Sequence, residues 1–141
     1  MELERLQGSS GAAGPQAAEV LITDDDPSCL AALERAFRIQ GLRTISCRDG
    51  REAWAAIRGN PYISLVVLNW MLPQLDGHAI CRLLRKHRPA VASVLMVGQS
   101  FLREAWTALD LQTRYVLTKP FPKSGIDRTV ASIVLDAFRR C

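Results

Sequence analysis

Short apolar runs alternate with segments of helical periodicity along most of the chain, beginning at Glu19. A short run bounded by turn residues is typical of a buried strand, whereas apolar residues that recur every three or four positions are typical of an amphipathic helix. Strands are expected at residues 19–23, 42–47, 63–68, 91–97 and 115–117. Helices are expected within residues 27–41, 49–61, 76–89, 102–111 and 124–138.

Turn and capping residues mark the ends of these helices. Pro27 suits a first helical turn, where its missing N–H leaves no bond unmade. Asp49 and Asp76 are expected to cap the second and third helices through their carboxylates. Gly41 ends the first helix and Pro89 stops the third, because glycine tolerates the left-handed conformation that follows a helix and proline cannot continue one.

The alternation predicts an α/β fold, with a parallel sheet and helices on both of its faces. Residues 63–68 are apolar on both faces, as expected for a central parallel strand. Ligands in such folds bind beyond the carboxyl ends of the strands. The residues expected at this edge are Asp24, Asp25 and Asp26, then Asn69, Gly98 and Lys119.

The composition is that of an ordinary globular domain. The chain has 141 residues, of which 48% are hydrophobic and 23% charged. Residues 1–18 are expected to form a flexible leader, because small residues dominate them without apolar periodicity, and residues 19–141 are expected to form one domain. No apolar run reaches the roughly 18 residues of a membrane span. No signal peptide pattern begins the sequence, so we expect no membrane partner and a cytoplasmic location.

The net charge of +4 gives little reason to expect a nucleic-acid partner. Basic residues concentrate in the third expected helix, at Arg82, Arg85, Lys86 and Arg88. We interpret them as a solvated helix face, because no nucleic-acid-binding motif accompanies them. The cysteines are Cys29, Cys47, Cys81 and Cys141. They form no C-x-x-C pair and match no zinc module, so free thiols in a reducing cytosol are expected.

Three segments carry a resemblance to a known family. They are Val20-Leu21-Ile22-Thr23-Asp24-Asp25-Asp26-Pro27, the block from Leu65 to Gly77, and Leu117-Thr118-Lys119-Pro120-Phe121. In this order and spacing they resemble the response-regulator receiver domain, the phosphate-accepting module of two-component signalling, over residues 19–138. The resemblance implies a flavodoxin-like (βα)5 fold, a doubly wound five-stranded parallel sheet in the strand order 2-1-3-4-5. It also implies a cis bond before Pro120.

The resemblance gives a role to each residue at the sheet edge. The acidic pair Asp24 and Asp25 and the backbone carbonyl of Met71 match the positions that hold Mg²⁺ in the family. The phosphate-accepting aspartate falls at Asn69. The lysine that neutralises charge on the transferring phosphoryl group falls at Lys119.

Three positions lack the chemistry that the family uses. Asn69 cannot form an acyl phosphate, and the loss of one negative charge weakens the expected Mg²⁺ binding. The position of the phosphate-binding hydroxyl falls at Gly98 and that of the aromatic switch residue at Val116, and neither side chain supplies the group. Tyr115 should point to the opposite face of its strand. Ser100 offers a substitute hydroxyl if the alignment shifts.

These observations favour a receiver-like signalling module that works without phosphorylation and is not an enzyme. Its partner is expected to be a protein: a histidine kinase, an output domain or another signalling protein. Docking is expected on the face made by the fourth helix, the fifth strand and the fifth helix, which active family members use. A homodimer would be compatible with the same face.

The residues leave two alternative functions. The first is an ordinary phosphoacceptor regulator with an aspartate-to-asparagine change at residue 69. The second is an Mg²⁺-dependent phosphohydrolase or a flavodoxin-like enzyme. Asp24 and Asp26 have the D-x-D spacing of such phosphohydrolases, but the matching downstream acids are absent, and consecutive acids repel the phosphate of a flavin. The acids also have a structural interpretation as a helix start, with Lys119 as an ion-pair partner of Asp24 or Asp25.

Overall fold

The computed structural model describes residues 19–107, 113–121 and 123–138. The expected leader at residues 1–18 and residues 108–111 of the expected fourth helix lie outside this part of the chain. None of the helices within it combines the length and the hydropathy that a membrane span requires.

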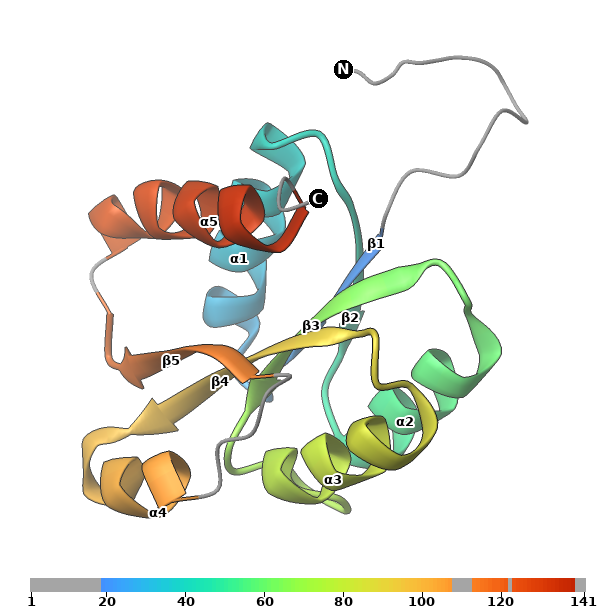
Figure 1. Cartoon of the computed structure of the whole chain (residues 1–141). Coiled ribbons are helices and arrows are strands. Elements are labelled where there is room, and N and C mark those ends of the chain that lie inside the picture. The colour runs from blue at the N-terminus through green and yellow to red at the C-terminus, as the bar shows by residue number, and fades with distance from the viewer. Residues whose placement is uncertain (1–18, 108–112, 122, 139–141) are drawn as a thin grey trace, which may run out of the picture.

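A five-stranded parallel sheet forms the centre of the fold (Figure 1). Its strands are β1 (Glu19–Thr23), β2 (Arg43–Cys47), β3 (Ile63–Asn69), β4 (Ala92–Gly98) and β5 (Thr113–Lys119). They lie in the order β2-β1-β3-β4-β5, and each neighbouring pair is parallel. The predicted flavodoxin-like fold and its strand order are therefore confirmed.

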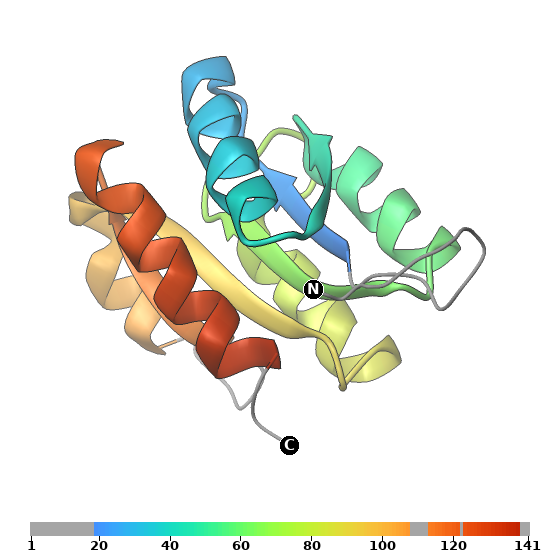
Figure 2. The same cartoon turned by 90° about the horizontal axis from the view of Figure 1, so that it is seen from above.

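Helices cover both faces of this sheet. In the described part of the chain they are α1 (Pro27–Ile39), α2 (Gly50–Gly59), α3 (Gly77–His87), α4 (Leu102–Thr107) and α5 (Lys123–Phe138). The helices α1 and α5 pack on one face, and α2 and α3 cover the other face. Figures 1 and 2 show α4 on the same side of the sheet as α2 and α3.

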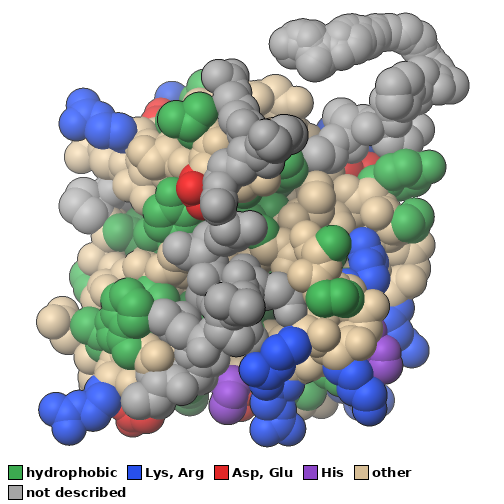
Figure 3. Space-filling view, viewed as in Figure 1, with side chains coloured by type: hydrophobic (Ala, Val, Ile, Leu, Met, Phe, Trp, Pro, Cys, Tyr) green, Lys and Arg blue, Asp and Glu red, His purple; other side chains and the backbone are tan. Residues whose placement is uncertain are grey.

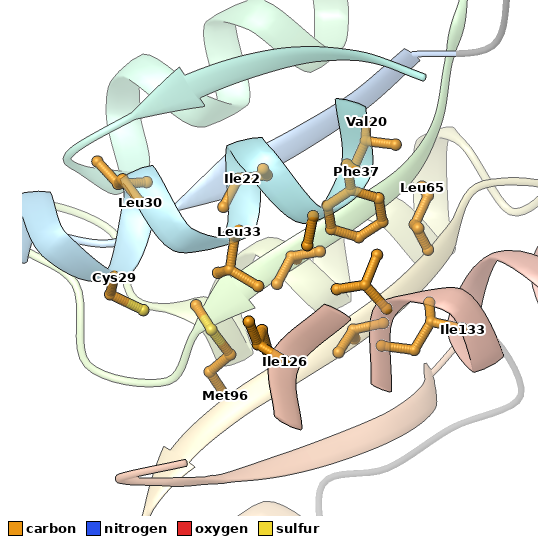
Figure 4. Packing of buried hydrophobic residues seen from close by; sticks show 14 of the residues in the cluster. Val20, Ile22, Cys29, Leu30, Leu33, Phe37, Leu65, Met96, Ile126 and Ile133 are labelled. Carbon is orange, nitrogen blue, oxygen red and sulfur yellow. The ribbon is translucent and has the colours of Figure 1, made fainter. Parts of the chain in front are cut away.

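The core consists of two hydrophobic clusters, one on each face of the sheet. Successive side chains of a strand point to opposite faces, so each central strand contributes to both clusters. Val20 and Ile22 pack with Phe37 and Ile133 on the side of α1 and α5 (Figure 4). Leu21 belongs to the cluster on the side of α2 and α3. Burial on both faces explains why the strands read as nearly continuous apolar runs.

The predicted helix boundaries are confirmed by their capping bonds. The helix α1 begins at Pro27, and Gly41 follows its end with φ of 83°. Asp49 caps α2 by accepting a hydrogen bond from the backbone N–H of Glu52 at 2.8 Å. Asp76 caps α3 through the N–H of Ala79, also at 2.8 Å.

Two elements near the end of the chain differ from the prediction. The strand β5 is longer than the expected residues 115–117, because it pairs with β4 from Thr113 to Lys119. A 3₁₀ turn (Gln99–Phe101) precedes α4. The length of β5 depends on pairing with β4, which local sequence patterns do not reveal.

The interpretation of Arg88 as part of a solvated face is wrong. Its guanidinium donates to the carbonyl oxygens of Ile57 at 2.6 Å and Ile63 at 3.1 Å. Longer bonds reach the carbonyls of Asn60 and Pro61, both at 3.4 Å. Arg88 thus ties the end of α3 to the turn between α2 and β3.

Candidate functional site

The carboxyl edge of the sheet brings three predicted side chains together in a cluster that we call the Asp24 site. Asp24 directly follows β1, Asn69 ends β3 and Lys119 ends β5. Lys119 Nζ lies 2.7 Å from Asp24 Oδ2, and Asn69 Nδ2 donates to Asp24 Oδ1 at 3.2 Å. The Asp24 side chain is fully buried, so this carboxylate depends on its protein partners for compensation of its charge.

Two further donors reach the Asp24 carboxylate. The backbone N–H of Asp26 donates to Asp24 Oδ1 at 3.0 Å. The Cys29 thiol also hydrogen-bonds to Asp24, and burial together with this bond raises the pKa of the thiol to about 12. Both oxygens of Asp24 therefore have hydrogen-bond partners, as a stable buried carboxylate requires.

Lys119 provides the positive charge of the site. Burial alone would lower the pKa of Lys119, but its hydrogen bond and charge interaction with Asp24 outweigh burial, and the pKa is raised above its ordinary value. The ammonium group is thus held in its charged form opposite the Asp24 carboxylate. The Lys119–Pro120 peptide bond is cis, as expected.

Thr23 positions Asn69, and the sequence analysis did not identify it. Its hydroxyl donates to the carbonyl of Val67 at 3.2 Å and accepts a hydrogen bond from the backbone N–H of Asn69 at 3.0 Å. Thr23 is fully buried at the end of β1. The available signal was a hydroxyl residue that closes an otherwise apolar strand, directly before the acidic residues.

The neighbouring acids differ from Asp24 in their surroundings. Asp25 is exposed at the rim, so the predicted acidic pair consists of one buried and one exposed carboxylate. Asp26 caps α1, accepting hydrogen bonds from the N–H of Ser28 at 3.0 Å and from its hydroxyl at 3.1 Å. The hydrogen bonds from Ser28 hold the pKa of Asp26 below its usual value. The structural interpretation as a helix start therefore describes Asp26.

The other predicted positions lie on three different elements. Met71 is in the loop after β3, with an exposed side chain. Gly98 ends β4 beside Lys119 in the sheet register, and a Cβ atom at Gly98 would meet no atom within 4 Å. Val116 packs against the cluster under α2 and α3, whereas Tyr115 packs on the side of α1 and α5. The expectation that these two side chains point to opposite faces is confirmed.

The loop between β3 and α3 folds tightly over the end of β3. The N–H of Gly77 donates to the carbonyl of Trp70 at 3.2 Å. A Cβ atom at Gly77 would lie 2.5 Å from the carbonyl oxygen of Asn69, which explains the need for glycine here. The ring of His78 stacks on Trp70 with 5.4 Å between the ring centres. Sequence reasoning did not anticipate this stacked pair beside the site.

A Mg²⁺ ion at the Asp24 site would compete with contacts that the protein itself makes there. Among the residues that the structure describes, no group of three or more His, Cys, Asp or Glu side chains gathers as metal ligands. Mg²⁺ takes oxygen ligands, but both oxygens of Asp24 are engaged and Asn69 turns its amide nitrogen toward Asp24. A metal ion would have to displace contacts made by Lys119 and Asn69. The geometry instead suits a buried carboxylate that is already neutralised.

Comparisons with known sequences agree with this architecture. The family model described as "Response regulator receiver domain" matches residues 20–131. The probable transcriptional regulator ycf27 of Porphyridium aerugineum is 31% identical over 119 residues, which cover 84% of this chain and 49% of that protein. The transcriptional regulatory protein TcrA of Mycobacterium tuberculosis is 34% identical over 102 residues, covering 72% of this chain and 40% of that protein. The chain thus spans less than half the length of these relatives.

Solved structures give the same result for the fold. The receiver domain of the Francisella response regulator 1452 is 28% identical with a TM-score of 0.69, covering 82% of this chain and 95% of that one. A putative response regulator from Chloroflexus aurantiacus is 22% identical with a TM-score of 0.75, and the match covers 89% of this chain and 100% of that one. The solved structures thus agree with the fold, and the family model over most of the chain, together with the sequence relatives, shows that the chain belongs to the response regulator receiver domain family of two-component signalling.

Proposed function

We propose that this receiver domain works without phosphorylation at residue 69 and acts by binding another signalling protein. The observation that carries the proposal is the carboxamide of Asn69, which donates to the buried Asp24 carboxylate at 3.2 Å. Asn69 stands where the resemblance places the phosphate-accepting aspartate. A carboxylate can attack phosphorus and form an acyl phosphate, whereas a carboxamide is a poor nucleophile.

The charges of the site support the same proposal. Phosphoryl transfer depends on cations that neutralise the transferring group. Receiver domains typically bind Mg²⁺ at their acidic site, and here we propose that Mg²⁺ binds weakly at most, because Lys119 occupies Asp24 Oδ2 at 2.7 Å. In this proposal Lys119 holds the site together as the structural partner of Asp24.

The positions that would sense a phosphate also support the proposal of a receiver that works without phosphorylation. Gly98 has no hydroxyl to bind a phosphoryl oxygen, and Ser100 lies beyond it in the 3₁₀ turn, where it is exposed. Val116 has no ring that could move inward. A switch needs contacts that differ between its two states, and the described residues offer few such contacts at this edge.

We propose the face of α4, β5 and α5 as the docking surface for the protein partner. Receiver domains of response regulators interact with kinases and output domains, and such a protein is the partner that we propose. Large aromatic side chains are exposed beside β5: Trp106 on α4 is 57% exposed and Phe101 in the preceding turn is 36% exposed. Exposed aromatic residues commonly anchor protein interfaces, including those of homodimers.

A cytoplasmic location belongs to the same proposal. Cys29, Cys47 and Cys81 are buried, and none of these three described cysteines is in a disulfide. Proteins that keep unpaired thiols are typical of reducing compartments.

Intact-mass measurement after incubation with Mg²⁺ and acetyl phosphate tests the proposed function. The native protein is expected to gain no phosphoryl group, and the Asn69→Asp variant is expected to gain one. Gln99→Glu is the matched control, because it adds a carboxylate at an exposed position of the same sheet edge. An adduct on the native protein would contradict the proposal, and mapping it would identify the residue that accepts phosphate. If phosphorylation changed the conformation of the Asn69→Asp variant as fully as it does in an active receiver, the ordinary phosphoacceptor alternative would be favoured.

A further inference from the structure

A pocket separate from the Asp24 site lies between α2 and the loop that precedes α3. It has a volume of about 420 Å³ and is lined by Arg51, Trp54, Arg58, Gln74 and Leu75. We call it the α2 pocket. It shares no residue with the Asp24 site, and neither the family resemblance nor the proposed function gives it a role.

Three residues of α2 line this pocket in a regular order. Arg51, Trp54 and Arg58 are spaced i, i+3 and i+7, so they share one face of the helix, with the indole between two guanidinium groups. Seven residues of α-helix rise by roughly 10 Å, which sets the separation of the two arginines along the axis. The pocket therefore offers a cation, an aromatic surface and a second cation in a line.

Structural roles do not account for the two arginines. Arg51 and Arg58 are both exposed, and across residues 19–107, 113–121 and 123–138 neither has an ion-pair partner. Arg51 also lies in the first turn of α2, where the helix dipole disfavours a positive charge. The acid beside it, Glu52, accepts a hydrogen bond from the backbone N–H of Arg48 at 3.0 Å. Both guanidinium groups are thus available to a ligand.

The surface around the pocket extends its positive charge. The adjacent helix α3 carries Arg82, Arg85 and Lys86 and contains no acidic residue. Figure 3 shows Lys and Arg side chains gathered with both histidines over the region where Figure 1 places α2 and α3. These basic side chains extend the positive charge beyond the residues that line the pocket.

The floor of the pocket is apolar and held in place by the fold. Trp54 and Leu75 are partly buried against the cluster under α2 and α3, and the ring of His87 lies 5.8 Å from that of Trp54. The N–H of Gly50 donates to the carbonyl of Pro73 at 3.0 Å, which ties the start of α2 to the loop on the other side of the pocket. An apolar side chain can therefore bind between two fixed walls.

We propose that the α2 pocket binds an acidic segment of a partner protein, with an apolar side chain on Trp54 and Leu75 and carboxylates on Arg51 and Arg58. In an extended peptide alternate side chains share one face, so positions i, i+2 and i+4 can present an acidic, an apolar and an acidic side chain to the pocket together. The outer two are about 13 Å apart along the backbone, which the long side chains of two arginines about 10 Å apart along the helix can span. Arginine is suited to such carboxylates because its planar group can donate two parallel hydrogen bonds. The complementary basic surface of α3 favours further acidic residues in the same segment.

A peptide titration of the full, isotope-labelled chain by NMR tests this site. The probe is the capped peptide acetyl-Glu-Ala-Leu-Ala-Glu-amide, whose glutamates and leucine share one face when the peptide is extended, and its control has glutamine in place of both glutamates. Shifts are expected at amides of residues 50–58 and 74–75, with binding that weakens as salt is added. The variant Arg51→Glu/Arg58→Glu should weaken binding at least about tenfold, by reversing both charges that face the carboxylates.

The double variant Arg35→Glu/Arg38→Glu is the matched control, because it makes the same charge change at exposed positions of α1 on the opposite layer. It should leave binding unchanged, and Arg51→Gln/Arg58→Gln provides a milder second test if the reversal disturbs folding. Equal binding of the glutamine peptide, equal binding by either α2 double variant, or no shifts at all would overturn the proposal. Tighter binding of glutarate or of a thymidine oligonucleotide at the same amides would overturn it in favour of a small anion or a nucleic acid.

Discussion

At the scale of single residues, the Asp24 site resembles a buried ion pair more than a poised reaction centre. Asp24 is fully buried and receives hydrogen bonds from Lys119, Asn69 and the N–H of Asp26. Such pairs contribute little net stability when complete, but removing one partner leaves an uncompensated charge in a medium of low polarity. The site should therefore respond strongly to the loss of Lys119.

Lys119→Met is expected to lower the free energy of unfolding by about 3 kcal/mol, because Asp24 then has no cation. Lys86→Met is the control: it removes an exposed lysine on α3 and should change stability by less than about 0.5 kcal/mol. Urea denaturation followed by circular dichroism measures both changes. Equal stability of the two variants would show that the pair between Lys119 and Asp24 does not hold the site together.

The pH dependence of the same pair follows from the pKa of Lys119. Burial would lower this pKa, but the hydrogen bond and the charge of Asp24 outweigh burial and raise it. A group with a raised pKa in the folded state stabilises fully below its unfolded value, here 10.5, and loses that contribution as the pH rises through the folded pKa. The stability difference between native protein and Lys119→Met should stay constant from about pH 7 to 10 and shrink above that range. A difference that already shrinks below pH 9 would contradict this assignment.

At the scale of elements, two glycines of α2 have opposite roles. A Cβ atom at Gly50 would overlap the carbonyl oxygen of Leu75, because the start of α2 packs directly against the loop before α3. A Cβ atom at Gly59 would meet no atom within 4 Å. The contact at Gly50 also shapes the α2 pocket, so this glycine links the loop to the helix that it faces.

Gly50→Ala is expected to destabilise the fold by about 3 kcal/mol through overpacking of backbone against backbone. Gly59→Ala, made in the same helix, should be neutral or stabilising by up to about 1 kcal/mol, because alanine loses less backbone entropy on folding. Denaturation curves of both variants and the native protein give the comparison. A mild effect at Gly50 would mean that the loop before α3 yields easily.

Local signals predicted the elements well wherever the chemistry is local. The caps Asp49 and Asp76 and the end of α1 before Gly41 were all predictable, because each depends on its own few neighbours. The length of β5 was not, because it follows from pairing with β4, and the inward turn of Arg88 was not, because its acceptor carbonyls lie in another element.

The candidate site shows the same division. Parallel strands end at a common edge, so the sequence predicted that Asp24, Asn69 and Lys119 would converge, and the structure places them in contact. Their hydrogen bonds could not be predicted, since the donors of Asp24 come from several elements. Thr23 escaped notice because a hydroxyl at a strand end reveals its partners only once β1 and β3 are aligned.

At the scale of the whole molecule, neighbouring side chains of β5 pack into different hydrophobic clusters on the two faces of the sheet. Val116 faces the cluster under α2 and α3, and Tyr115 faces α5, where its hydroxyl donates to the carbonyl of Ser132 at 3.5 Å. A ring on the Tyr115 side cannot replace one on the Val116 side without reversing the strand face. Under the proposed function, the hydroxyl and the aromatic ring that the family resemblance places at Gly98 and Val116 are therefore missing between the Asp24 site and the helices α4 and α5.

This separation leads to a prediction that distinguishes lost chemistry from lost switching. Asn69→Asp should regain Mg²⁺ binding and accept phosphate, because the new carboxylate adds a negative charge beside Asp24, competes with Asp24 for Lys119 and can act as the nucleophile. Hydrogen exchange in β5 and α5 should nevertheless be the same with and without the phosphoryl group, because Gly98 has no hydroxyl and Val116 has no ring to make a contact specific to the phosphorylated state. Asn69→Asp/Gly98→Thr is the informative companion, since the open space at Gly98 admits the side chain, and its hydroxyl should slow loss of the adduct. Phosphate-dependent exchange in β5 and α5 of the single variant would show that other residues transmit the signal, and the account of Gly98 and Val116 would then be wrong.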